Sequence, residues 1–228
     1  MNARHPGKGV KMREKVQRQL EKIYGNLKMS WPGVILFAVI AGLYTGAVML
    51  IPALENTSFR DIGTYYEWWV IFAVIIVVNC KKSWEAMLKC FVFFLISQPL
   101  IFAVEVVMGP LETEQALYYY TQIWLPITML TLPGGWLAYY CKKQNAFGAV
   151  VLGMGNTIQA MLGLVYLVMT LRNFPRHILS FLVCIGSIFV MSFQLQKTKR
   201  NRRISLLVPV VLLVILVALA AATGRLHI

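Results

Sequence analysis

The chain has 228 residues, of which 58% are hydrophobic and 14% are charged, and its mean hydropathy is +0.66. These values exclude an ordinary soluble domain and indicate a membrane protein. The formal net charge is +13. In a membrane protein, excess Lys and Arg usually lie in cytoplasmic loops and set the orientation of the spans, so we do not take this charge as a sign of nucleic-acid binding.

A helix needs about 20 apolar residues to cross a bilayer, and the short alternating segments of a β-barrel are absent from this sequence. We therefore predict an all-α integral membrane protein, a bundle of seven transmembrane helices preceded by a cytoplasmic amphipathic helix. Residues 1–30 form a basic tail and 31–228 a single transmembrane domain. The spans are expected at about 32–54, 62–79, 87–108, 117–140, 146–171, 177–195 and 204–222.

The segment before the first span, "VKMREKVQRQLEKIYGNLK", places apolar residues three to four apart with Lys, Arg and Glu between them. This spacing predicts an amphipathic helix with a basic polar face. Such a helix can lie along the inner leaflet and contact anionic lipid. A short coiled coil or a partner-binding helix is the alternative.

Positive charge predicts the orientation, because cytoplasmic loops retain Lys and Arg. With the N-terminus inside, 18 of these residues fall on the cytoplasmic side and 4 outside. Seven spans then place the C-terminus outside. The short inner loops and the absence of disulfide spacing among four cysteines fit a prokaryotic plasma (inner) membrane.

Two spans contain residues that affect helix packing. Ala38, Gly42 and Gly46 follow one another at four-residue spacing, which lets two helices approach closely, either within the bundle or against a second copy or partner subunit. In the fourth span, Pro133, Gly134 and Gly135 weaken helical hydrogen bonding and predict a hinge or a static kink.

Polar residues within the spans gather in the predicted outer half. Glu105 and Glu67 are costly there unless they face a protein interior or a cavity. Together with aromatic and amide side chains they predict an outward-facing pocket for a cationic or hydrogen-bonding solute. The other candidate lining residues are Tyr66, Trp69, Gln98, Tyr119, Gln122, Asn156 and Gln159. Alternatively, one carboxyl carries a proton, or both simply reach the lipid headgroups.

No catalytic motif is present in the sequence. His5, His177 and His227 are too scattered for metal-ligand spacing, and we expect no enzyme, metal or cofactor. The sequence favours a small-solute permease, or a solute-binding membrane component that acts with a partner subunit or as a homo-oligomer. The alternative function is a non-transporting accessory subunit of a membrane complex.

Overall fold

The computed structural model describes residues 27, 29–55 and 57–223, and this part of the chain is all-α, with no strand. The predicted amphipathic helix before the first span lies outside the described residues, apart from Leu27. The helices are α2 (Trp31–Met49), α3 (Asp61–Thr64), α4 (Tyr66–Val78), α5 (Ser83–Met108), α6 (Thr113–Tyr119), α7 (Leu125–Ala138), α8 (Ala146–Arg172), α9 (Ile178–Leu195) and α10 (Lys199–Ala222). Short 3-10 turns lie at Pro52–Leu54 and Tyr139–Lys142, and a π-helical turn lies at Tyr120–Trp124.

Five helices in the described part are long and apolar enough to cross a membrane. They are α2, α5, α8, α9 and α10, the last over Lys199–Leu219. This confirms the helical class and indicates a multi-pass membrane protein. The predicted second and fourth spans differ from these five, because each is divided into shorter helices.

The second predicted span divides into α3 and α4 at Gly63. This glycine has a φ of 82°, in the left-handed region that other residues disfavour, and Tyr65 is extended. The Thr45 hydroxyl donates a hydrogen bond of 3.1 Å to the Gly63 carbonyl, which holds the break against α2. A continuous helix from residue 62 is therefore wrong, and α4 begins at Tyr66 with 13 residues.

The fourth predicted span contains the π-helical turn between α6 and α7. The Leu125 N–H bonds to the Tyr120 carbonyl five residues back. Pro126 has no N–H to donate to the carbonyl four residues before it, so the wider turn fits this sequence. Helix α7 then continues through Pro133 without a break, with Gly135 buried. Hinge motion at residues 133–135 stays a prediction.

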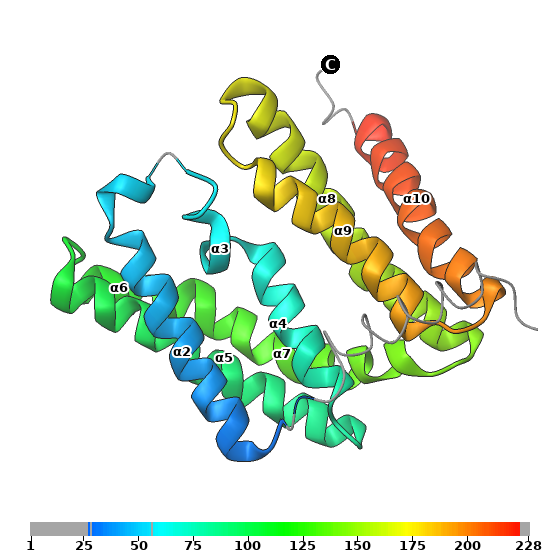
Figure 1. Cartoon of the computed structure of the whole chain (residues 1–228), viewed down its shortest axis with the longest axis horizontal. Helices are drawn as coiled ribbons and strands as arrows, with labels where there is room; N and C mark the ends of the chain where they lie inside the picture. The colour runs from blue at the N-terminus through cyan, green and yellow to red at the C-terminus, as the bar shows by residue number, and fades with distance from the viewer. Residues whose placement is uncertain (1–26, 28, 56, 224–228) are drawn as a thin grey trace, which may run out of the picture.

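Two groups of helices meet along α4. Figure 1 shows α2, α5, α6 and α7 on one side and α8, α9 and α10 on the other, and α4 contacts α5 and α7 as well as α8 and α9. We call these the N-terminal group and the C-terminal group. Phe93 is fully buried in the N-terminal group and packs against Phe37, Trp69 and Phe94, which fixes α2 and α4 on α5.

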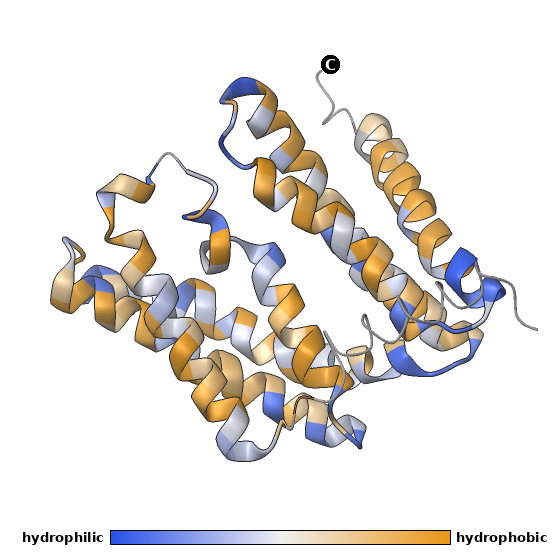
Figure 2. Ribbon diagram, in the orientation of Figure 1, coloured by the Kyte–Doolittle hydropathy of each residue, from blue (hydrophilic) through white to orange (hydrophobic). Residues whose placement is uncertain are grey.

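Hydrophilic residues concentrate at the helix ends and apolar residues along their lengths (Figure 2). Three Lys- and Arg-rich turns, at Lys81 and Lys82, at Lys142 and Lys143, and from Lys197 to Arg203, lie at one end of the molecule, which we call the basic end. The turns before α4, before α6 and before α9 lie at the opposite end.

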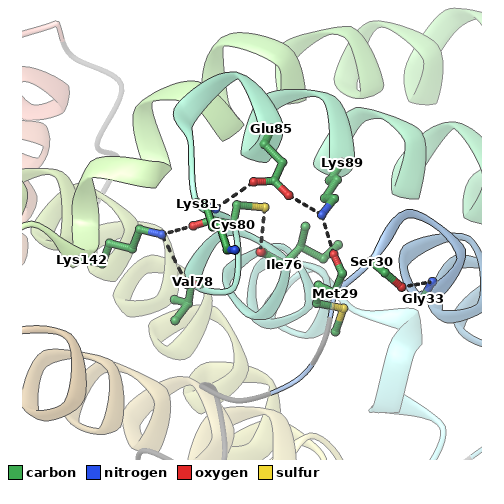
Figure 3. A network of polar contacts seen from close by, with 10 residues as sticks. All are labelled: Met29, Ser30, Gly33, Ile76, Val78, Cys80, Lys81, Glu85, Lys89 and Lys142. Carbon is green, nitrogen blue, oxygen red and sulfur yellow. Dashed lines mark hydrogen bonds and ion pairs between the residues drawn. The ribbon is translucent and has the colours of Figure 1, made fainter.

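A polar network closes the basic end (Figure 3). The Lys142 ammonium donates hydrogen bonds to the carbonyls of Val78 and Cys80, and so satisfies groups that the end of α4 leaves without helical partners. Glu85 accepts from the Lys81 N–H and forms an ion pair of 2.5 Å with Lys89. Burial lowers the pKa of the Lys142 ammonium and raises the pKa of the Cys80 thiol to about 11.

Candidate functional site

Glu105 lies in a wall shared by two pockets near the end opposite the basic end. The narrow pocket, of about 120 Å³, is lined by Thr45, Met49, Gly63, Thr64, Trp69, Gln98, Ile101, Phe102, Glu105 and Trp124. The wide pocket, of about 350 Å³, is lined by Met49, Leu50, Arg60, Glu105, Pro110, Leu111 and Gln115. Met49 and Glu105 belong to both, so the two pockets adjoin.

Four elements build the narrow pocket. Gln98 and Glu105 are seven residues apart on α5, which places them two turns apart on one face. The break at Gly63 places Gly63 and Thr64 in the pocket wall. The π-helical turn presents Trp124, whose ring stacks on Tyr66 with 6.0 Å between centroids. The irregular segments of both divided spans therefore meet at this pocket, as broken membrane helices do where they line cavities.

The charges of the site come from two elements. Arg60, from the turn before α3, lines the wide pocket and acts electrostatically on the Glu105 carboxyl. Arg60 also lies 3.7 Å from Glu55, but both of these side chains are partly exposed, so this pair is weak. The site thus offers a carboxylate, a guanidinium, an amide and aromatic faces within two adjoining pockets.

The structure brings together three of the nine predicted pocket residues, namely Trp69, Gln98 and Glu105. Tyr66 reaches the pocket only through its stack on Trp124. Tyr119 and Gln122 are exposed on the surface of α6 and the π-helical turn and line neither pocket. Their aromatic and polar character fits the bilayer interface instead.

Asn156 joins the helices of the C-terminal group. Its amide donates hydrogen bonds of 2.9 Å to the Ser192 hydroxyl and 3.1 Å to the Ser205 carbonyl. These bonds tie α8 to α9 and α10. Asn156 is fully buried and has a structural role here, away from both pockets.

Glu67 and Gln159 lie between the two helix groups. The Gln159 amide donates a hydrogen bond of 3.2 Å to the Glu67 main-chain carbonyl. A cluster of polar side chains surrounds this point, and we call it the interface cluster. It contains Asp61, Tyr65, Glu67, Tyr166, His177 and Ser180.

Asp61 and His177 join α3 to the start of α9 in the interface cluster. The Asp61 carboxyl lies 3.2 Å from His177 Nδ1, and the two residues are 2% and 5% exposed. Burial raises the pKa of the Asp61 carboxyl, although the positive charges of His177 and Arg176 oppose this effect. The ring of Tyr65 packs edge-to-face with the rings of Tyr166 and His177, and each pair of ring centroids is 5.3 Å apart.

The small-residue face of α2 is covered by α5. A Cβ at Gly42 would lie 2.7 Å from the Ser97 carbonyl oxygen, and one at Gly46 would lie 2.7 Å from Val104 Cβ. Ala38 on the same face is fully buried. This face packs inside the chain, so it is not open for docking another subunit.

Sequence reasoning missed Arg60, Thr45, Gly63 and Trp124 as pocket residues. The glycine in "RDIGTYYE" and the proline two residues after Trp124 are the signals that would have located the two breaks. No protein-family model, curated protein or solved structure matches the chain. Within the described ranges, no three His, Cys, Asp or Glu side chains are arranged to hold a metal ion.

Proposed function

We propose that the protein is a solute-binding permease, or the solute-binding membrane component of one, and that its site is the pair of pockets joined at Glu105. The observation that carries this proposal is the position of Glu105. It combines a carboxylate with Gln98 and the rings of Trp69 and Trp124 beside a break in a membrane-depth helix. Concave sites with a few convergent polar groups among apolar walls are typical of small-ligand binding.

The solute that fits best carries a small ammonium group. A carboxylate surrounded by aromatic faces favours a cation, and a volume of about 120 Å³ admits only a compact head group. The wide pocket, with Arg60 and Gln115, suits a polar remainder that accepts hydrogen bonds. Small amines and zwitterionic amino acids are therefore the first compounds to test.

The proposed topology has seven crossings. Residues 62–79, which include α4, form the second, and residues 117–140, which include the π-helical turn and α7, form the fourth. The basic end would lie at the cytoplasmic face of a prokaryotic plasma membrane, against anionic lipid, and both pockets would open to the outside. Single cysteines introduced at Glu114 and Lys143 test this arrangement. An impermeant maleimide should label Glu114→Cys in intact cells and Lys143→Cys only after permeabilisation.

Ligand-dependent thermal stability of the purified full chain tests the binding site. A ligand at 100 times its dissociation constant stabilises the folded state by about 2.7 kcal/mol, which a melting curve resolves easily. We expect an amine or amino acid to raise the melting temperature of the wild type and of Glu114→Gln, an exposed residue outside both pockets. The same compound should have no effect on Glu105→Gln.

Stabilisation that persists in Glu105→Gln would contradict the assignment of the site. A screen of amines, amino acids, vitamins and nucleosides without any stabilising compound would contradict solute binding itself. In that case the accessory-subunit function becomes the better proposal. It would have to use a surface other than the face of α2 that α5 covers.

A further inference from the structure

Glu67 is a fully buried carboxyl without a partner in the described part of the chain. It lies on the first turn of α4, where α4 contacts α8 and α9. Its exposed fraction is 0%, and neither carboxyl oxygen has a hydrogen-bond partner among the described residues. The hydroxyls of Ser180 and Tyr166 face this carboxyl but lie outside hydrogen-bonding geometry. The solute site does not use this group.

An ionised carboxylate at this position would be costly. Burying an unpaired charge is strongly destabilising even after the protein relaxes, whereas a neutral carboxylic acid needs only hydrogen-bond partners. The ion pairs of the described residues join Arg60 to Glu55, Lys89 to Glu85 and His177 to Asp61, and none includes Glu67. A proton is the smallest cation that neutralises the group without requiring a hydrated cavity.

The Ser180 hydroxyl completes the arrangement. It is fully buried, has no hydrogen-bond partner among the described residues, and faces both the Glu67 and the Asp61 carboxyls. A protonated Glu67 can donate its O–H to Ser180, and the Tyr166 hydroxyl can donate to the other Glu67 oxygen. The neutral acid can therefore be satisfied by these two hydroxyls, and it needs no counter-ion, which the ion pairs of the described residues do not provide.

We propose that Glu67 is a proton-binding site within the interface cluster, beside Asp61, His177 and Ser180. In the binding step, an acid in solution such as hydronium loses its proton, which forms an O–H bond with a Glu67 carboxylate oxygen, and no other bond is made or broken. The titratable and charged groups facing this site are Asp61 of α3, Tyr65 before α4, Tyr166 of α8 and Cys184 of α9. His177 and Arg176, from the turn before α9, adjoin Asp61.

The position of the site gives the proton a structural effect. Glu67 lies where the N-terminal and C-terminal groups meet, and Trp69, two residues along α4, lines the narrow pocket. Loss of the proton leaves a charge in this closed interface, which favours conformations that admit water between the two groups. The proton site exists whether or not the pocket at Glu105 binds a solute.

Infrared spectroscopy of the full chain in lipid nanodiscs tests the proposal. At neutral pH exposed carboxyls are ionised, because their ordinary pKa is about 4. A carboxylic-acid C=O absorption that shifts in D₂O therefore reports a buried protonated acid. We expect this absorption in the wild type, loss of the Glu67 component in Glu67→Gln, and persistence of that component in Glu105→Gln and Glu114→Gln.

Ser180→Ala provides a second test in case Glu67→Gln does not fold. The acid then loses its acceptor, so its C=O absorption should remain and move to higher frequency. No acid absorption in the wild type, or one unchanged in both Glu67→Gln and Ser180→Ala, overturns the proposal. Stabilisation by sodium chloride but not by choline chloride, abolished in Glu67→Gln, would overturn it in favour of an alkali-metal site.

Discussion

The contact between α2 and α5 leaves no room for a methyl group at Gly42. We predict that Gly42→Ala destabilises the protein, although Ala is the better helix former. The added Cβ would lie 2.7 Å from the Ser97 carbonyl oxygen and 3.0 Å from Leu100 Cβ. The Ser97 oxygen belongs to the main chain of α5, so it cannot move without displacing the helix.

The expected magnitude follows from two opposing effects. Replacing Gly by Ala in a helix interior stabilises by about 1 kcal/mol. Overpacking a closely packed contact destabilises by about 1–3 kcal/mol, and a clash with main chain belongs in the upper half of that range. The net loss for Gly42→Ala is therefore about 1–2 kcal/mol.

Gly155 provides the matched control, because a Cβ at this position on α8 meets nothing within 4 Å. Gly155→Ala should gain the helix propensity of Ala without any steric clash, so the free energies of unfolding of the two variants should differ by about 2–3 kcal/mol. Thermal melting followed by the circular dichroism of the helices, in the same detergent, measures this difference. A melting temperature for Gly42→Ala equal to or above that of Gly155→Ala would refute the packing argument.

Three further predictions concern polar contacts. Lys142→Met should lower the free energy of unfolding by about 1–3 kcal/mol, because the carbonyls of Val78 and Cys80 lose their hydrogen-bond donor. Lys143→Met, at the exposed neighbour, should have little effect on the melting temperature measured in the same way. Asn156→Leu should lower the free energy of unfolding by a similar amount, because the bond from α8 to the Ser205 carbonyl of α10 is lost. Unchanged stability in detergent-induced unfolding would count against this role of Asn156. Burial raises the pKa of Asp61, so its contribution to stability is full below the unfolded-state value and is lost as pH rises through the folded-state value. Asp61→Asn should therefore flatten the decline of melting temperature with rising pH, and an unchanged slope would show that Asp61 does not titrate in this window.

Hydropathy alone predicted the long spans, because an apolar stretch of sufficient length has few alternatives to a membrane helix. The second span was harder to predict from sequence. "WWVIFAVIIVV" is apolar but too short to cross a bilayer alone, and the sequence does not show whether the preceding "TYYE" extends it as helix. Non-helical backbone at Ile62, Gly63 and Tyr65, with the Gly63 carbonyl bonded to Thr45 of α2, determines where α4 begins.

The candidate site was predictable in composition but not in arrangement. Glu105 stands out in the sequence as a carboxyl without a nearby cation. Arg60, which lines the same wide pocket, lies 45 positions earlier, and α3, which follows it, packs against α2. Asp61 and His177 are 116 positions apart, and no local pattern relates them. Side chains that meet through tertiary contacts between helices carry no periodic signal.

In the proposed topology, the shortness of α4 would determine how the membrane potential acts on the protein. With 13 residues, α4 is about 20 Å long, whereas the hydrocarbon core is about 30 Å thick. If water reaches the break before α4, most of the voltage falls along this helix. A unit charge that crosses the whole field gains about 2.3 kcal/mol per 100 mV. Glu67 lies on the first turn of α4, before that drop, so the proposed proton binding there should depend little on voltage.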